Sequence, residues 1–415
     1  MVRNRNFMLL WTATMISRAG DTFTFLALAV KIDSLFADPG GSARALGMIL
    51  IAFALPQLVF GLFAGTLVDR WDRRRVMVAA DLLRAGMAPA FILLQTTADL
   101  PWAGVVAFGL AGFGVFFYPA RTALLPNLVA EEELITANSY LQVGETVARL
   151  SGPVLAGIVL GAWGPTTAFV VDGASFLLSG LLLIGIWGAT TRVARDESDA
   201  GSTFRELRQG VQYALGSKLL QGVTIGLGLA VLGVGAVDVL FVPFMRYAFS
   251  APPEALGVLM TAQGVGMLLG GGLMSALGKR MAPRTVAAAS LGVLGLGTAA
   301  LGLAPAYWLA LPVMALIGLA LTPLNAALQT ILQRGVPAEL LGRAGSVVDM
   351  FIGLAQLLSM GGAGWFGDAI GLRQTYELAA GLLIAGAVVL ALLLGRAAAV
   401  EGRTEKIEVA AEVAA

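Results

Sequence analysis

Twelve long apolar stretches, most of them containing a glycine, a proline or a charge, follow one another along the chain. A stretch of about 20 apolar residues can span the hydrocarbon of a bilayer as a helix, because a helix satisfies its backbone hydrogen bonds internally. We therefore expect an all-α integral membrane protein with twelve transmembrane helices. The expected helices cover Phe7–Phe36, Arg44–Val68, Val76–Thr97, Trp102–Pro126, Asn138–Gly161, Thr166–Gly188, Leu219–Ala248, Glu254–Leu277, Thr285–Ala304, Tyr307–Leu332, Arg343–Phe366 and Thr375–Leu394.

The composition limits the chemistry that such a protein can perform. The chain of 415 residues has no Cys and no His, which excludes disulfides, thiolate metal sites and histidine proton relays. Any proton carrier must therefore be a carboxylate, and we expect neither a cofactor nor a bound metal. The net charge of +1 gives no indication of nucleic-acid binding.

Basic residues are concentrated in the loops that would share one side of the membrane with both termini. Examples are Arg3, Arg5, the cluster Arg73–Arg75 and the pair Arg205 and Arg208. Loops rich in arginine and lysine stay in the cytoplasm. The sequence thus predicts a multi-pass protein of the inner cell membrane of a prokaryote, with both termini in the cytoplasm.

The longest polar break divides the apolar stretches into two sets of six. Within this break, residues 203–215 carry an apolar face at helical spacing, which predicts an amphipathic helix on the membrane surface. We expect an N-terminal six-helix bundle at 1–189, a cytoplasmic linker with this helix at 190–217, a C-terminal six-helix bundle at 218–396 and a disordered cytoplasmic tail at 397–415.

The two halves echo each other at an offset of about 205 residues. Glu145 corresponds to Asp349 at this offset, and Asp33 corresponds to Asp238. The repeat predicts two pseudo-symmetric bundles, the plan of a transporter whose halves rock against each other. A channel or a membrane enzyme would need no such duplication.

The loop between the second and third expected helices carries a specific motif. It reads Gly65-Thr-Leu-Val-Asp-Arg-Trp-Asp-Arg-Arg-Arg75 and resembles the signature loop of the major facilitator superfamily, G-x-L-x-D-R-x-G-R-R. Asp72 departs from this pattern, which has Gly there. We expect a cytoplasmic gate in which Asp69 faces the start of the eleventh helix, near Leu340–Arg343. The gating residues are Gly65, Asp69, Arg70, Arg73 and Arg74.

Further segments extend the resemblance over nearly the whole chain. They are Ala80-Asp-Leu-Leu-Arg84, Pro119-Ala-Arg-Thr-Ala-Leu-Leu-Pro126 and Ala137-Asn-Ser139; in addition, Gly152-Pro-Val-Leu-Ala-Gly157 resembles the G-P-x-x-G-G element that is typical of exporters in the superfamily, with Ala156 in place of a Gly. Together they are similar to the enterobactin-exporter-like and macrolide-efflux-like permeases of the superfamily. The resemblance implies the major facilitator fold and export of a small molecule by proton antiport. Many such antiporters carry an arginine in the fourth helix, where this chain has Phe108.

Charged residues inside apolar helices are costly and therefore indicate function. We expect proton coupling from Asp21 with Arg18, from Glu145 paired with Arg149 at helical spacing, and from Asp349. Asp172 and Asp238 fall in the outer parts of their helices, where solvation at the interface is favoured. Substrate-cavity candidates are Phe25, Phe117, Gln142, Asp238, Gln263, Asn325, Gln329 and Gln356.

The sequence therefore favours a monomeric secondary transporter that exports a small amphiphilic or hydrophobic molecule, with protons and membrane lipids as its other partners. It has no phosphate-binding loop for ATP and no catalytic constellation, so we expect no enzyme. One alternative is a lipid or lysophospholipid transporter without ion coupling, because Pro323-Leu-Asn-Ala-Ala-Leu-Gln329 is reminiscent of such proteins. Another alternative, of a different class, is a passive channel.

Overall fold

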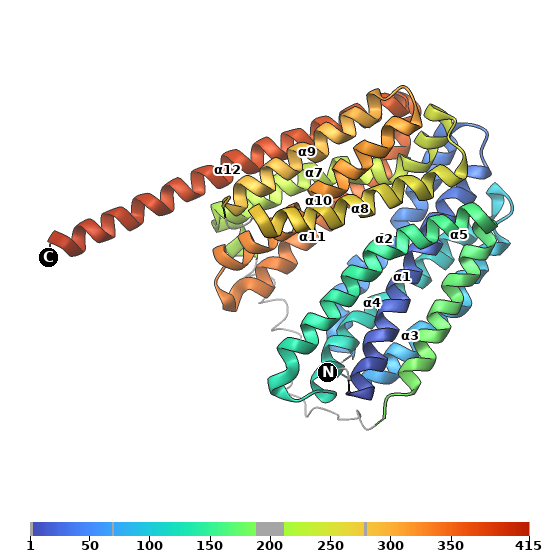
Figure 1. Ribbon diagram of the computed structural model, residues 1–415, viewed down its shortest axis with the longest axis horizontal. Helices are drawn as coiled ribbons and strands as arrows, with labels where there is room; N and C mark the ends of the chain where they lie inside the picture. The colour runs from blue at the N-terminus through green and yellow to red at the C-terminus, as the bar shows by residue number, and fades with distance from the viewer. Residues whose placement is uncertain (1–2, 69, 188–210, 278–279, 415) are drawn as a thin grey trace.

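The protein is built from long helices in two lobes. The computed structural model describes residues 3–68, 70–187, 211–277 and 280–414. Figure 1 shows α1–α5 in one lobe and α7–α12 in the other. The helices are α1 (Arg5–Ser34), α2 (Pro39–Val68), α3 (Arg73–Met87), α4 (Leu100–Leu124), α5 (Leu134–Ile184), α7 (Lys218–Pro243), α8 (Pro253–Leu277), α9 (Pro283–Leu303), α10 (Ala310–Gly335), α11 (Ala338–Ala369) and α12 (Leu372–Ala414).

These helices account for the twelve expected membrane crossings. Ten segments of the described chain are long and apolar enough to span a bilayer. One of them, Glu131–Ile184, contains two crossings, because α5 turns sharply at Gly164, whose φ is 78°, and continues from Pro165. α1 supplies the remaining crossing: it has 30 residues, but Arg18 and Asp21 interrupt its apolar sequence. The predicted all-α membrane fold is thus confirmed.

Two predicted segments outside the membrane, the amphipathic helix at 203–215 and the disordered tail at 397–415, compare with the structure as follows. The first part of the predicted amphipathic helix, 203–210, lies outside the described residues, whereas 211–216 are helical. α12 continues as one helix to Ala414, through the segment for which the sequence predicts a disordered tail.

The departure of Asp72 from the signature loop has a local structural reason. Asp72 is the N-cap of α3, and its Oδ1 accepts a hydrogen bond from the backbone N–H of Arg75 at 2.9 Å. Aspartate is among the best N-caps because its side chain satisfies a helical N–H that otherwise has no partner. The loop therefore ends at a capped N-terminus of α3.

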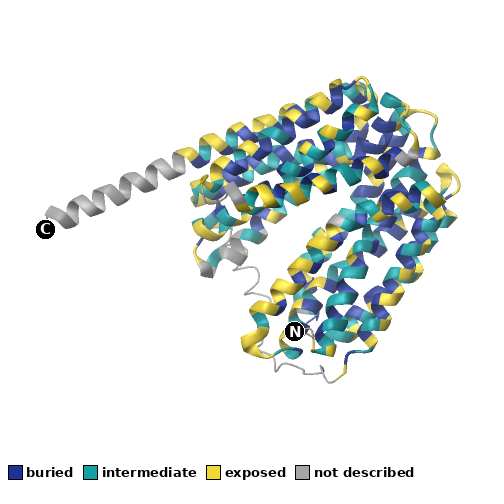
Figure 2. Cartoon of the chain, viewed as in Figure 1, coloured by how far each residue is buried: buried dark blue, intermediate teal, exposed yellow. Residues whose placement is uncertain are grey.

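The lobes pack against each other at the end of the molecule opposite the start of α1. α2 packs on α11 there, and α5 packs on α8. One hydrophobic cluster contains buried residues of both lobes, among them Ile49 of α2 and Leu240 of α7. Figure 2 shows buried residues where the lobes meet, and Figure 1 shows the lobes diverging toward the end that carries the N-terminus.

A glycine pair brings α5 and α8 together at this closed end. A Cβ added to Gly257 would lie 2.8–2.9 Å from backbone atoms of Gly157, so a side chain at either position would push the helices apart. Gly157 belongs to the Gly-Pro-Val-Leu-Ala-Gly element of the sequence. Close helix packing through small residues is typical of membrane proteins.

Polar contacts close the same end. Asp33 of α1 is buried, and Arg246, in the π-helix Phe244–Ala248 that follows α7, donates to its backbone carbonyl at 2.6 Å and to its Oδ2 at 2.9 Å. Ser42 of α2 donates to Asp33 Oδ1 at 2.5 Å. The Tyr247 hydroxyl donates to the carbonyl of Phe36 at 3.0 Å. The bonds from Arg246 and Tyr247 join the two lobes directly.

Removal of the Asp33 charge is expected to open this end. Hydrogen bonds to charged groups contribute about 1.5–3 kcal/mol, and each ~1.4 kcal/mol changes a population ratio about tenfold. In Asp33→Asn we expect a larger fraction of molecules with separated lobe ends. The chain has no Cys, so spin labels can be attached at W163C and W308C, two exposed positions, and their distance measured by electron–electron double resonance.

The matched control is Asp38→Asn. Asp38 is exposed at the same end, but it accepts from Gly41 N–H within its own lobe. An unchanged distance distribution in both Asp33→Asn and Arg246→Gln would show that these residues do not hold the lobes together.

Candidate functional site

A cavity of about 540 Å³ lies in the N-terminal lobe, between α1, α2, α3 and α4. Its wall is largely apolar and aromatic with a few polar groups, as is usual for small-molecule sites. The lining residues are Ser17, Arg18, Asp21, Thr24, Phe25, Phe53, Gln57, Gly61, Ala64, Arg84, Leu110, Ala111, Gly114, Val115, Phe117, Tyr118 and Pro119. Four sequence candidates thus meet here: Arg18, Asp21, Phe25 and Phe117.

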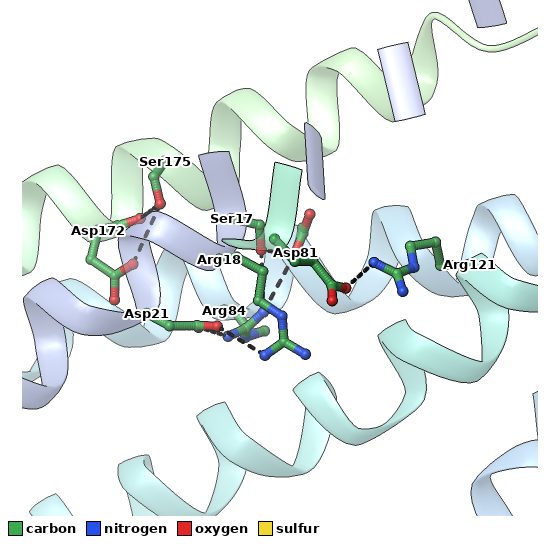
Figure 3. A network of polar contacts seen from close by, with 9 residues as sticks. Ser17, Arg18, Asp21, Asp81, Arg84, Arg121, Asp172 and Ser175 are labelled. Carbon is green, nitrogen blue, oxygen red and sulfur yellow. Dashed lines mark hydrogen bonds and ion pairs between the residues drawn. The ribbon is translucent and has the colours of Figure 1, made fainter. Parts of the chain in front are cut away.

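Asp21 is the carboxylate of this cavity, and its main partner is Arg84. The guanidinium of Arg84 on α3 contacts Asp21 Oδ1 directly, and Arg18 lies 3.6 Å from Asp21 Oδ2 (Figure 3). The side chain of Asp21 is 30% exposed, whereas that of Arg84 is 7% exposed. The predicted Arg18–Asp21 contact is present, but the buried Arg84 is the closer partner.

Arg84 holds several groups together. Its Nη1 lies 3.6 Å from Asp81 Oδ1, and its guanidinium carbon lies 3.9 Å from the ring centre of Phe176 on α5. The Ser179 hydroxyl donates to Asp81 Oδ2 at 2.5 Å. A buried cation requires such compensation, because desolvation of an unpaired charge is expensive. α1, α3 and the second half of α5 are therefore joined around one guanidinium.

The predicted pair Glu145–Arg149 is not formed. Glu145 instead binds Arg121 of α4, whose side chain is 6% exposed and lies over the ring of Tyr118. Arg149 is exposed and makes no ion pair with any described residue. Helical spacing suggested the bond to Arg149, but a buried cation from a neighbouring helix lies closer. The only sequence signal for Arg121 was its position in the segment Pro119–Pro126.

The environment of Asp172 differs from the one predicted from the sequence. Its side chain is fully buried on the second half of α5, next to α1, rather than solvated at an interface. Asp172 lies outside the lining of the cavity, beside the Asp21–Arg84 pair (Figure 3).

Asp238 faces a second, smaller pocket between the lobes. Phe25 and Phe53 line both pockets, so the two spaces adjoin at these rings. The Asp238 side chain is exposed and makes no ion pair with any described residue. A free carboxylate beside aromatic rings is an arrangement that attracts a cation.

The remaining cavity candidates lie elsewhere. They do not line the two pockets, and their side chains are exposed or half-buried: Gln142 on α5, Gln263 on α8, Asn325 and Gln329 on α10, and Gln356 on α11. The proton-coupling candidate Asp349 on α11 is likewise exposed and lines neither pocket. Gln57 and Tyr118 also line the larger cavity, and neither residue is among the candidates predicted from the sequence. In the described part of the chain, no group of three or more acidic residues could hold a metal ion.

The arginines of the signature loop bind the ends of neighbouring helices. Arg73 Nη1 donates to the carbonyl of Ala123 at 3.2 Å, and Arg74 Nε donates to that of Leu183 at 3.0 Å. Cations at helix C-termini are favourable because the last carbonyls carry partial negative charge. Arg70 is exposed and Gly65 lies in α2, whereas Asp69 lies outside the described residues. The latch expected from Asp69 stays a prediction.

Comparison with known proteins shows where this architecture belongs. Residues 1–412 match the family described as transmembrane secretion effector. Macrolide efflux protein A of Streptococcus pyogenes is 26% identical over 398 residues, which cover 94% of this chain and 97% of that protein. Multidrug efflux pump Tap of Mycolicibacterium fortuitum is 26% identical over 391 residues, which cover 92% of this chain and 94% of that protein.

Solved structures agree on the fold. A bacterial homologue of the human lysosomal transporter Spinster, in an inward-facing and unoccupied conformation, superposes with a TM-score of 0.73 at 15% identity and covers 94% of this chain and 97% of its own. A mutant of the nucleoside transporter NupG gives a TM-score of 0.75 at 11% identity and covers 94% and 99%. The chain is therefore a multi-pass membrane transporter that belongs to the major facilitator superfamily, in the family of transmembrane secretion effectors.

Proposed function

We propose that this transporter exports amphiphilic molecules, preferably cationic ones, in exchange for protons, and that it works as a monomer by alternating access. The observation that carries the proposal is the Asp21–Arg84 pair at the wall of the cavity. Asp21 is partly exposed to the cavity, and its carboxylate forms an ion pair with Arg84, which also pairs with Asp81. Protonation of Asp21 would release Arg84, so a proton from the cavity could change the packing of α1 against α3.

The lobes give this exchange a direction. If both termini are cytoplasmic, the diverging ends of the lobes face the cytoplasm and the contacts of Asp33 with Arg246 close the outer side. A substrate would enter the cavity from the cytoplasm or the inner leaflet and leave after the outer contacts have opened. The efflux relatives support export as the direction.

Transport by inverted membrane vesicles tests the function. The panel contains a macrolide, a lipophilic cation and a neutral hydrophobic dye, each with and without an acidic vesicle interior. Accumulation that requires the pH gradient supports antiport. Saturable movement indifferent to the gradient would instead indicate an uncoupled lipid-type transporter, and flux without saturation would indicate a channel.

Asp21→Asn is expected to abolish accumulation against a gradient while substrate binding persists, because the amide cannot exchange a proton. Accumulation is measured in the inverted vesicles and binding in detergent by fluorescence. The control is Glu377→Gln, which removes an exposed carboxylate of α12 outside both pockets. Gradient-driven accumulation by Asp21→Asn at the wild-type level would place the coupling group elsewhere.

Asp238→Asn is expected to weaken binding of cationic substrates by at least tenfold and to leave neutral ones unaffected. Two opposite charges about 4 Å apart attract by roughly 4 kcal/mol near a protein surface, and tenfold in affinity corresponds to only ~1.4 kcal/mol. The dissociation constants of a lipophilic cation and of a neutral analogue of similar shape are compared. Equal losses for both ligands would argue that Asp238 shapes the pocket rather than selecting charge.

Arg149→Gln is expected to slow transport without lowering thermal stability, because Arg149 has no ion-pair partner among the described residues in this conformation. We propose that Glu145 exchanges Arg121 for Arg149 when the lobes rock. Arg121→Gln should reduce both transport and the melting temperature, since breaking a buried pair costs about 3–5 kcal/mol. A fully active Arg149→Gln would leave the Arg121–Glu145 bridge as a static element.

A further inference from the structure

Asp172 is a buried carboxylate that the cavity does not reach. It lies on the second half of α5 and presses against the backbone of α1: a Cβ at Gly20 would lie 2.6 Å from its Oδ1. The Ser175 hydroxyl is 3.4 Å from Oδ1, but its shorter bond, at 2.8 Å, goes to the backbone carbonyl of Asp172. Oδ2 has no hydrogen-bond partner among the described residues. The bonding that this carboxylate receives there is therefore weak.

The surrounding charges of the described chain leave Asp172 without a cation. α1 contributes Asp21 and the half-exposed Arg18, and α3 contributes Asp81 and Arg84. The 3₁₀ helix Ala88–Leu93, which also packs on α5, contains no charged residue. Both arginines are engaged with Asp21, and Arg84 also lies near Asp81. Three carboxylates therefore share two cations, and neither cation forms an ion pair with Asp172.

A neutral acid fits this environment better than a carboxylate. An ionised carboxylate without a cation or strong donors is very costly in a low-dielectric interior, whereas the protonated form carries no charge and gains an O–H donor. An acceptor is available on α1, where Thr24 follows Gly20 by one helical turn: its buried hydroxyl lies near Asp172 but makes no hydrogen bond of normal geometry in the described structure. A proton on Asp172 would thus allow a hydrogen bond between its carboxyl group and the Thr24 hydroxyl, two buried groups that otherwise leave an oxygen without a hydrogen-bond partner.

We infer that Asp172 is a second proton-binding site, which holds its proton in the conformation with diverging lobe ends. The role in transport rests on the proposed antiport. Arg84 stacks on Phe176, one helical turn from Asp172, and could swing from Asp21 toward α5. In that step Arg84 would pair with the Asp172 carboxylate, the Asp172 proton would pass to the freed Asp21 carboxylate, and Asp21 would release it into the cavity.

Infrared spectroscopy of the purified full-length transporter tests this site directly. A protonated carboxyl group has a C=O stretch that is distinct from carboxylate bands and shifts in deuterium oxide. We expect such a band at neutral pH in the wild type, in Asp81→Asn and in the control Asp99→Asn, but its loss in Asp172→Asn. The absence of the band from the wild type, or its full retention in Asp172→Asn, would overturn the inference.

Thermal stability gives a second, independent readout. Asn has the shape of the neutral acid, so Asp172→Asn should melt at the wild-type temperature or above it. Gly20→Ala should melt lower, because its methyl group collides with Asp172 and Ser175. A marked drop in the melting temperature of Asp172→Asn would contradict a neutral Asp172.

A failure of the Asp172 inference can be distinguished from a failure of the proposed antiport. Wild-type accumulation that ignores the pH gradient would refute antiport, and with it the relay, while the infrared band would still establish the protonated site. In a gradient-driven wild type, we expect Asp172→Asn to equilibrate substrate without accumulating it. Wild-type accumulation by this variant would overturn the relay role.

Discussion

The packing of α1, α3 and α5 in the N-terminal lobe depends on the buried cation of Arg84. Arg84 is surrounded by apolar helices, and its charge must be compensated inside the lobe. Asp21 of α1, Asp81 of its own helix and the ring of Phe176 on α5 provide that compensation. Three helices that are far apart in sequence are thereby fixed in one arrangement. A change in the protonation of any of these carboxylates would change the partners that Arg84 can keep.

The helices could be predicted from the sequence because a membrane allows few solutions. An apolar stretch of sufficient length must be helical in hydrocarbon, so the expected spans and the observed helices agree within a few residues at most ends. The helix that contains Gly164 shows the same point, since a sharp turn at Gly164–Pro165 separates two crossings that the sequence had already divided there. The signature loop around Asp72 could also be predicted from the sequence, but the role of Asp72 as the N-cap of α3 became evident only from the backbone structure.

The charge pairs could not be predicted in the same way, because they depend on packing between helices. Spacing along one helix correctly brought Arg18 near Asp21, but it also suggested Arg149 for Glu145. The partner of Glu145 is Arg121, which comes from α4, and periodicity within a helix contains no information about that contact. Asp172 shows a related limit: its distance from the helix end suggested solvent, whereas its burial depends on the close approach of Gly20.

The two lobes divide the charged groups unequally. In the N-terminal lobe, Asp33 and Glu145 are each bound by an arginine from another helix, whereas their counterparts in the C-terminal lobe, Asp238 and Asp349, are exposed and make no ion pair with any described residue. When a paired carboxylate is protonated, it loses the charge that holds its arginine and the arginine is released. An unpaired carboxylate remains free to attract a cation. Under the proposed antiport, the N-terminal lobe would bind the protons and Asp238 of the C-terminal lobe would select the substrate. Because the two pockets share two aromatic rings, a substrate bound at Asp238 would lie against the helix that carries Asp21, and the two events would be coupled through α1.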